Sequence, residues 1–387
     1  MTPTDAVNDA DLRVLAMCVF HLTGERRWLE PPFAPQRDVR LIADESAGFA
    51  PEVADQIRAA AVDAYEFVEA GGTPAISDPG HDLMVQMMSV CLGQEVPAEY
   101  APLVREELGF ASRTVEWPAG ARLAELGDGA QHVDHEVIVV GAGSSAIAMS
   151  HSLTELGIEH VILERASSVG GVWRDNRYPG AGVDTPNHAY SFSFAPPRQW
   201  SRYFALQPEL ERYLCDMADE FGVTQRIEFG HEVVACRWDD DGCRWHVTSR
   251  TATGEVTRTC RAVVSAIGQL NVPVAPDLPR IDSFRGPAVH SSLWPDDLEL
   301  SGARVAVVGS GASANQIVPA ITDQVDRLVI LQRTAQWARP IDRYHDAIPA
   351  GSQWLFERLP FYAAWFRFSM WWRYGDGLLP LLRKDPQ

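Results

Sequence analysis

The sequence predicts an α/β protein in which a helical N-terminal segment precedes two units built alike, each a buried strand, a glycine-rich turn, a helix and a second strand. Two observations lead to this prediction. Apolar residues recur at three- and four-residue spacing through residues 50–72 and 81–93, as in amphipathic helices. Further along, two continuous apolar runs, residues 137–140 and 305–308, each enter a glycine-rich turn, as buried parallel strands do. Because the chain has 387 residues, we expect more than one folding unit.

We expect residues 1–115 to form a helical extension. The stretch from residue 50 keeps its helical spacing up to Gly71 and Gly72, and the segment HDLMVQMMSVCLG has a similar pattern. We interpret the methionines of this region as core residues. Residues 116–133 mix proline, glycine and charged residues, a composition that is typical of a linker.

The first glycine turn predicts a dinucleotide site. Gly141, Gly143 and Ala146 have the G-x-G-x-x-G/A spacing, which provides a tight turn, room for the backbone to approach a pyrophosphate, and close helix packing. The N-terminus of the following helix then faces the phosphates. Glu164 ends the second strand roughly 20 residues further on, where a carboxylate can accept hydrogen bonds from ribose hydroxyls. The alternative interpretation is a turn with a structural role alone.

The second glycine turn repeats this construction with a different ending. Gly309, Gly311 and Ala314 supply the spacing, but the next strand ends in Arg333 and Thr334 and not in an acid. An arginine and a hydroxyl suit a 2′-phosphate, which a carboxylate would repel, so this turn predicts NADP over NAD. The alternative is an arginine that is merely solvated at a strand end. Two different dinucleotides are most simply FAD followed by NADPH, each in a Rossmann-like domain.

Composition disfavours several functions. The net charge of −19 argues against binding to nucleic acids or anionic membranes, since these polyanions would be repelled. No apolar stretch is long enough to span a bilayer, and the N-terminus lacks the basic start of a signal peptide. The six cysteines show no CxxC pair or metal-ligand spacing. We therefore expect reduced thiols, a cytoplasmic location and no metal site.

The segment between the two turns resembles a known fingerprint. The F-x-G-x-x-x-H-x-x-x-W-P/D pattern of Baeyer–Villiger monooxygenases is matched by Phe284, Gly286, His290, Trp294, Pro295 and Asp296. The segments GGVW, NRYPG, VD before YSFSF, and QRTAQW are similar to further segments of that family. The resemblance covers residue 134 to the end, and the helical extension is similar to that of 4-hydroxyacetophenone monooxygenase-type members.

This resemblance implies a domain order and a reaction. It implies an FAD-binding domain in residues 134–280, a linker in residues 281–300, and an NADP-binding domain with the start of a helical subdomain in residues 301–387. In the family, NADPH reduces FAD, the reduced flavin forms a C4a-peroxyflavin with O2, and one oxygen atom is inserted into a ketone to give an ester or lactone. The implied partners are a small ketone and O2, and the extension allows for a homodimer.

The resemblance also implies roles for individual residues. Asp184 corresponds to the aspartate that orients a catalytic arginine, and His290 to a hinge residue that couples domain positions during turnover. A satisfied structural histidine is the alternative for His290. The expected cofactor-binding residues are Gly141, Gly143, Ala146, Glu164, Gly171, Val172, Trp173, Asp184, Tyr190, Val233, Gly268, Gly309, Gly311, Ser313, Ala314, Arg333 and Thr334.

Two features depart from the family pattern. The chain has Gly182 where the family commonly has an arginine two residues before the aspartate. Family members continue well past the equivalent of Gln387, so we expect a C-terminally truncated chain without the peroxide-stabilising arginine and the closing strands of its domains. Two alternative functions follow, an N- or S-oxidising flavin monooxygenase of the same fold and a non-catalytic FAD-binding remnant. The ending of the fingerprint disfavours the former.

Overall fold

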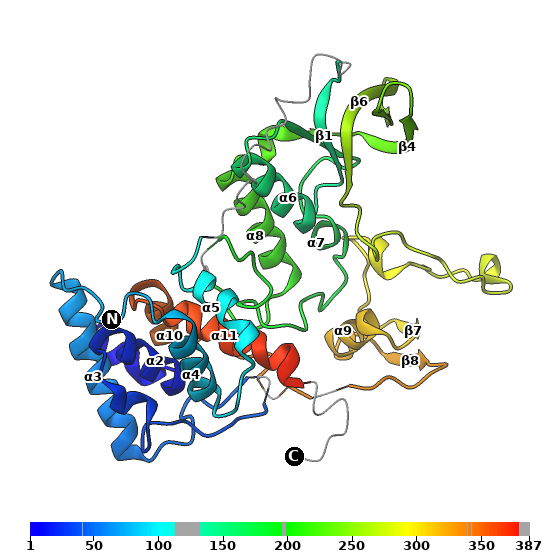
Figure 1. Ribbon diagram of the computed structural model, residues 1–387. Helices are drawn as coiled ribbons and strands as arrows, with labels where there is room; N and C mark the ends of the chain where they lie inside the picture. The colour runs from blue at the N-terminus through cyan, green and yellow to red at the C-terminus, as the bar shows by residue number, and fades with distance from the viewer. Residues whose placement is uncertain (41, 113–131, 196–198, 339, 342, 379–387) are drawn as a thin grey trace. The chain divides into compact units, whose positions relative to one another are not determined.

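The computed structural model describes residues 1–40, 42–112, 132–195, 199–338, 340–341 and 343–378 (Figure 1). The chain divides into two compact units. Unit 1 comprises Met1–Arg113, Val183–Ala205 and Arg339–Gln387, and unit 2 comprises Thr114–Gly182 and Leu206–Ala338. The segments expected from the sequence are continuous in the chain, whereas both units are assembled from separate stretches. The expected linker, residues 116–133, lies almost entirely outside the described residues.

Unit 1 is helical. Its helices are α1 (Pro3–Ala6), α2 (Leu12–Thr23), α3 (Pro51–Glu69), α4 (Gly80–Leu92), α5 (Ala101–Glu107), α10 (Ala350–Arg358) and α11 (Tyr362–Tyr374), with 3₁₀ turns at Val7–Asp9, Arg26–Leu29, Ala98–Tyr100 and Asp376–Leu378. The helical pattern predicted for the extension is confirmed, since α3 ends just before Gly71 and α4 ends at Leu92, with Gly93 as its C-cap at a φ of +63°. In the described part of the chain, no helix combines the length and the apolar character that crossing a bilayer requires.

Helix α2 lies in the core of unit 1. Its residues Leu12–Leu22 are buried, and α3, α4 and α11 contact it. Asp11 caps the helix, because its Oδ1 accepts hydrogen bonds from the backbone N–H groups of Arg13 (3.1 Å) and Val14 (3.4 Å). The backbone N–H of Asp11 donates to Oη of Tyr362 at 2.9 Å. The N-terminal helices and the last helices therefore share one core.

Unit 2 contains a six-stranded sheet in the order β3-β2-β1-β6-β5-β4. The strands are β1 (His135–Val140), β2 (His160–Glu164), β3 (Ile227–Phe229), β4 (Glu232–Asp239), β5 (Arg244–Thr251) and β6 (Gly254–Ser265). Strands β3, β2, β1 and β6 run parallel, whereas β6, β5 and β4 pair antiparallel. The predicted α/β class with a buried parallel sheet is confirmed.

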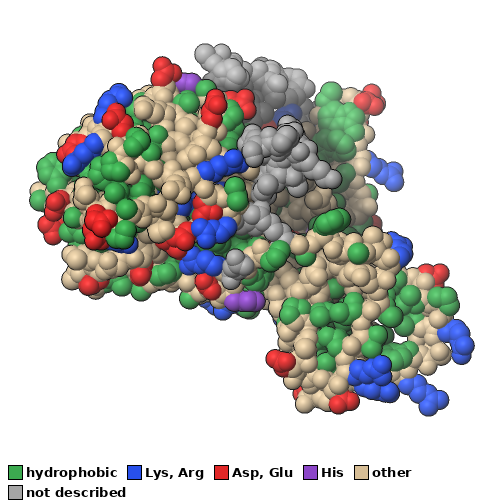
Figure 2. Space-filling model, turned by 90° about the horizontal axis from the view of Figure 1, so that it is seen from below, with side chains coloured by type: hydrophobic (Ala, Val, Ile, Leu, Met, Phe, Trp, Pro, Cys, Tyr) green, Lys and Arg blue, Asp and Glu red, His purple; other side chains and the backbone are tan. Residues whose placement is uncertain are grey.

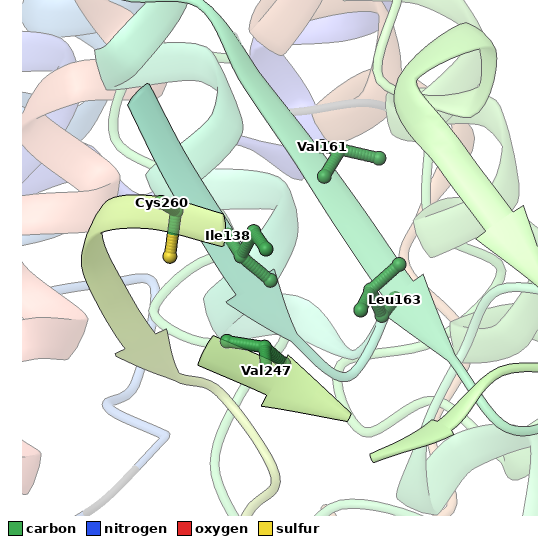
Figure 3. Packing of buried hydrophobic residues seen from close by; sticks show 5 residues of the cluster. All are labelled: Ile138, Val161, Leu163, Val247 and Cys260. Atoms are coloured by element: carbon green, nitrogen blue, oxygen red, sulfur yellow. The ribbon is translucent and has the colours of Figure 1, made fainter. Parts of the chain in front are cut away.

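A small cluster of buried apolar residues packs on this sheet (Figure 3). It consists of Ile138, Val161, Leu163, Val247 and Cys260. Because Val140 pairs with Leu163, the carboxyl ends of β1 and β2 lie side by side, which is where the first glycine turn begins. The helices of this part are α6 (Ser144–Glu155), α7 (Val172–Asp175) and α8 (Gln207–Glu220), with a 3₁₀ turn at Thr224–Arg226.

The second predicted strand–turn–helix–strand segment forms a separate two-stranded sheet, which belongs to unit 2. It consists of the parallel strands β7 (Arg304–Val308) and β8 (Arg327–Leu331), joined by α9 (Ala312–Ile321), and 3₁₀ turns precede it at Ile281–Ser283 and Ser291–Leu293. Apolar side chains remain exposed here, with Val308 at 55% and Leu331 at 53%. On the face drawn in Figure 2, hydrophobic side chains lie between interspersed acidic and basic ones.

Candidate functional site: two glycine turns of unit 2

Gly141 makes the sharp turn that follows β1. Its φ of +95° lies in the region that favours glycine, and a Cβ at this position would lie 2.8 Å from the backbone oxygen of Ala266. Its N–H donates a hydrogen bond to the backbone oxygen of Leu163 at 2.8 Å. A side chain at this position would therefore displace either the turn or the segment that follows β6.

Gly143 and Gly171 let two backbone segments approach each other. A Cβ on Gly143 would lie 3.7 Å from Cα of Gly171, and a Cβ on Gly171, which has a φ of +54°, would lie 3.1 Å from Cα of Gly143. Gly143 is the N-cap of α6, and no side chain caps this end of the helix. Ala146 is fully buried in the first turn of α6. The uncapped amide groups at the start of α6 can therefore donate to an anion such as a phosphate.

Glu164 lies where the sequence predicts it, at the end of β2, but its carboxylate already has protein partners. Its side chain is 6% exposed. Oε2 accepts a hydrogen bond from the backbone N–H of Ala142 at 2.7 Å, and Oε1 accepts one from the N–H of Ala166 at 2.8 Å. A carboxylate offers roughly four acceptor positions, so capacity for a ribose hydroxyl remains. Glu164 thus holds the glycine turn, and its role in binding a ribose stays a prediction.

The loop after β2 carries three further predicted residues. Gly171 is the N-cap of α7, and Val172 and Trp173 form its half-buried first turn. Gln207 of α8 donates a hydrogen bond to the backbone oxygen of Trp173. The hydrogen bond holds the GGVW segment against α8, and the approach of Gly171 to Gly143 places the same segment beside the start of α6.

Of the two remaining unit 2 residues predicted for the first site, one lies on the sheet and the other lies in the segment after β6. Val233, on β4, packs against the apolar cluster of the sheet. Gly268 follows Ala266 closely in the chain and has a φ of +73°. A role of either residue in cofactor binding stays a prediction.

The second glycine turn repeats the first in geometry. Gly309 follows β7 with a φ of +108°, and its N–H donates to the backbone oxygen of Leu331 at 2.9 Å. Gly311 is the N-cap of α9, which no side chain caps, and Ser313 and Ala314 lie in the first turn of that helix. The start of α9 is therefore a second place where uncapped amide groups can meet a phosphate.

The residues predicted to contact a 2′-phosphate follow β8. Arg333 is exposed, and no hydrogen bond or ion pair joins it to another residue of the described ranges. The hydroxyl of Ser310 donates to the backbone oxygen of Thr334 at 3.3 Å and accepts from Nε2 of Gln332 at 2.9 Å. These bonds hold the end of β8 against the turn, and the role of Arg333 and Thr334 in binding a 2′-phosphate stays a prediction.

Gln316 of α9 binds the loop that contains YPG. Its Oε1 accepts a hydrogen bond from the hydroxyl of Tyr178 at 2.9 Å, and its Nε2 donates to the backbone oxygen of Gly182 at 2.7 Å. Gly180 has a φ of +80°, and a Cβ there would lie 2.5 Å from the backbone oxygen of Gln316. Two hydrogen bonds of Gln316 therefore connect α9, the helix after the second glycine turn, to the loop of residues 178–182.

His290 of the fingerprint segment has local partners. It is the N-cap of the 3₁₀ turn Ser291–Leu293, where its Nδ1 accepts the backbone N–H of Ser292 at 3.2 Å and lies 2.8 Å from the hydroxyl of that residue. Because Nδ1 accepts, the neutral ring carries its proton on Nε2. Asp296 forms an exposed ion pair with Arg177 at 3.3 Å. The hinge role of His290 stays a prediction.

Asp184 and Tyr190 lie in unit 1, whereas both glycine turns lie in unit 2. Both residues are exposed. The backbone beside Asp184 is well held, since the N–H of Val183 donates to the oxygen of Ala205 at 3.1 Å and the oxygen of Val183 accepts from the hydroxyl of Tyr344 at 2.8 Å. The predicted roles of Asp184 and Tyr190 stay predictions.

A family model described as flavin-binding monooxygenase-like matches residues 134–349, which include both glycine turns and the fingerprint segment. The chain belongs to this flavin-binding monooxygenase-like family. A Baeyer–Villiger monooxygenase of Streptomyces coelicolor is 44% identical over 229 residues, which make up 57% of this chain and 43% of that protein. The protein named uncharacterized monooxygenase y4iD of Sinorhizobium fredii is 36% identical over 387 residues, 99% of this chain and 56% of that protein. The chain spans about half the length of the curated relatives it matches.

Solved structures of similar proteins agree with this assignment. OTEMO in complex with FAD and NADP is 33% identical with a TM-score of 0.55, over 59% of this chain and 44% of that one. Closed cyclohexanone monooxygenase is 36% identical with a TM-score of 0.50, over 53% of this chain and 39% of that one. The predicted resemblance to Baeyer–Villiger monooxygenases is confirmed. The similarity of the extension to the 4-hydroxyacetophenone monooxygenase type stays a prediction.

Two residues of this flavin-binding monooxygenase-like chain were missed by the sequence analysis. Gln316 follows the second glycine spacing by two residues, but nothing in the pattern indicates that its amide reaches Tyr178. Arg174 lies in the GGVWRDN segment, and its guanidinium is buried beside Glu164. The available signal was the position of Arg174 in the sequence, because it follows an apolar stretch and comes ten residues after Glu164.

Proposed function

We propose that this chain supplies the FAD- and NADPH-binding part of a Baeyer–Villiger monooxygenase that inserts one atom of O2 into a ketone to give an ester or lactone. The observation that carries the proposal is an order of features in one chain. A glycine turn with Glu164 at its strand end comes first, the fingerprint of residues 284–296 follows, and a glycine turn with the free Arg333 comes last. A relative named Baeyer–Villiger monooxygenase and a neighbour solved with FAD and NADP support it.

The first turn fits the pyrophosphate and ribose of FAD. Gly143 and Gly171 leave no side chain between the two backbone segments, and the uncapped start of α6 offers amide donors. Glu164 retains acceptor capacity for a ribose hydroxyl. When bound, FAD supplies the electron transfer and the reaction with O2, and these residues bind and orient it.

The second turn fits NADPH. The start of α9 is uncapped, and the exposed guanidinium of Arg333 follows the neighbouring strand, where a 2′-phosphate requires positive charge. Gln316 connects this helix to the loop of residues 178–182. Through this connection, the residues of the second turn can hold the loop that precedes Asp184.

Flavin retention tests the first site. Gly143→Asp should remove FAD from the purified chain, because a carboxylate would occupy the approach to Gly171 and repel the pyrophosphate. Thr154→Asp is the matched control, since it adds the same charge at an exposed position in the last turn of α6. Absorbance near the flavin bands, measured per mole of protein, gives the result. Equal flavin content in wild type and Gly143→Asp contradicts the assignment.

Product analysis tests the reaction. The chain is incubated with FAD, NADPH and O2, together with a cyclic ketone or a thioether, and the lactone, sulfoxide and hydrogen peroxide are measured. Lactone formation supports the proposal. Sulfoxide without lactone would identify an S-oxidising enzyme, and bound flavin without any oxygenated product would indicate a binding role alone.

A further inference from the structure

Arg174 carries a charged group into the interior of unit 2. Its side chain is 9% exposed, so the charge requires close partners. Nε and Nη2 donate to the carboxylate of Asp175 at 2.7 and 3.1 Å. Nη1 donates to the backbone oxygen of Ser168 at 2.7 Å and to Oε1 of Glu164 at 3.3 Å. One side chain thus joins α7, the loop before it and the end of β2.

The two oxygens of Glu164 have different surroundings. Oε1 receives both Arg174 and the backbone N–H of Ala166. Oε2 has one hydrogen-bond donor among the described residues, the N–H of Ala142 in the glycine turn. Because a carboxylate oxygen has two lone pairs, Oε2 can accept one more hydrogen bond. Arg174 and the N–H of Ala166, which donate to Oε1, therefore hold the carboxylate in the orientation in which Oε2 faces the N–H of Ala142.

The loop that carries Arg174 also forms part of the glycine cradle. The N–H of Gly170 donates to the backbone oxygen of Ala142 at 3.1 Å, and Gly171 lies against Gly143. A Cβ on Gly170 would lie 3.0 Å from Cβ of Arg174, so this loop packs closely around the arginine. A movement of the guanidinium would displace the acid and the cradle together.

We propose that Arg174 is a positioning residue for the adenosine half of FAD. It holds the Glu164 carboxylate in the orientation in which Oε2 binds the glycine turn and accepts a hydrogen bond from the ribose. The inference rests on the proposed function, because it requires FAD at the first turn. A buried ion pair is by itself weak evidence for stability, and the place of this one beside the turn favours a role in recognition.

The test measures ribose recognition. ADP and 2′,3′-dideoxy-ADP are titrated as competitors of FAD, with the recovery of free flavin fluorescence as the signal, so that only the FAD site is read. The wild-type chain should prefer ADP by about 10-fold or more, as expected for a hydrogen bond to a charged acceptor. Arg174→Gln should lose most of this preference. Arg165→Gln is the matched control, because Arg165 lies in the same loop with its side chain half exposed and only a 3.8 Å contact to Asp175.

Arg174→Lys provides the conservative variant. An ammonium group keeps the charge, but its donors share one nitrogen atom, whereas Arg174 reaches Asp175, Ser168 and Glu164 from three nitrogen atoms. An intermediate preference is therefore expected. If Arg174→Gln does not fold, a full wild-type preference in Arg174→Lys overturns the inference.

The outcomes separate this inference from the proposed function. If Arg174→Gln keeps the full preference for ADP, Arg174 is only a structural ion pair, even where the melting temperature falls. If Arg165→Gln loses the preference to the same extent, the effect is general electrostatics and the inference is wrong. If the wild-type chain binds neither FAD nor ADP, the proposed function fails and the inference fails with it.

Discussion

Alanine at Gly141 should destabilise unit 2 more than alanine at Gly309. Both glycines have positive φ values, +95° and +108°, so each alanine costs about 1–2 kcal/mol in conformation. A stiffer unfolded chain offsets about 0.4–1 kcal/mol of this cost at either position. The new methyl group at Gly309 meets nothing within 4 Å, whereas at Gly141 it would lie 2.8 Å from the oxygen of Ala266. Relieving that contact requires a backbone shift of about 1–3 kcal/mol, which is the expected difference between the variants.

Urea unfolding followed by circular dichroism measures this difference. A chain with two units need not unfold in one step. The urea midpoints of wild type, Gly141→Ala and Gly309→Ala are therefore compared for one transition, the one whose midpoint changes in Gly141→Ala. FAD titration provides the second readout, and only Gly141→Ala should weaken flavin binding. Equal destabilisation by the two alanines would show that the contact with Ala266 relaxes without cost and would refute the reasoning.

Two further predictions concern charge. Arg333→Ala should weaken NADPH binding by about 10- to 150-fold and leave NADH nearly unchanged, since a charge-assisted hydrogen bond contributes about 1.5–3 kcal/mol; a fluorescence titration that finds equal losses would place this arginine outside the 2′-phosphate site. Burial and the nearby Arg367 lower the pKa of His188 to about 3, and the rings of Phe356 and Phe366 pack against it. Below a pH of about 6.5, the unfolded chain binds a proton at this histidine and the folded chain does not. The free energy of unfolding therefore decreases as the pH falls from 6.5 toward 3, by up to about 1.4 kcal/mol per pH unit. His188→Phe should therefore lose about 2 kcal/mol less stability than wild type between pH 7 and pH 5 in urea unfolding, and an unchanged pH dependence would contradict the assignment.

The local features of the fold could be predicted from the sequence because their signals are local. An apolar run followed by glycines at fixed spacing leaves few conformations, so β1, β7 and the turns after them were predicted at the right residues. The helical spacing that ends at Gly71 likewise predicts the end of α3. In each case a few neighbouring residues determine the backbone.

The long-range features could not be predicted in this way. Periodicity shows that α2 has apolar residues but not that Tyr362 packs at its start. The same limit applies to the site, where Glu164 was recognised as an acid at a strand end, whereas its partner Arg174 depends on how a loop folds back. Such contacts depend on side chains that meet only after the chain has folded.

The assembly of unit 1 from distant segments affects how the chain folds during synthesis. The hydrogen bond between Asp11 and Tyr362 joins residues that are 351 positions apart. At roughly 5 to 20 residues per second, a ribosome needs on the order of 20 to 70 seconds to make the intervening chain, whereas an isolated helix forms within about a microsecond. Helices α3 and α4 can cover α2 soon after they emerge. The side of α2 that meets α11 gains this contact only after the ribosome has synthesised residues 362–374.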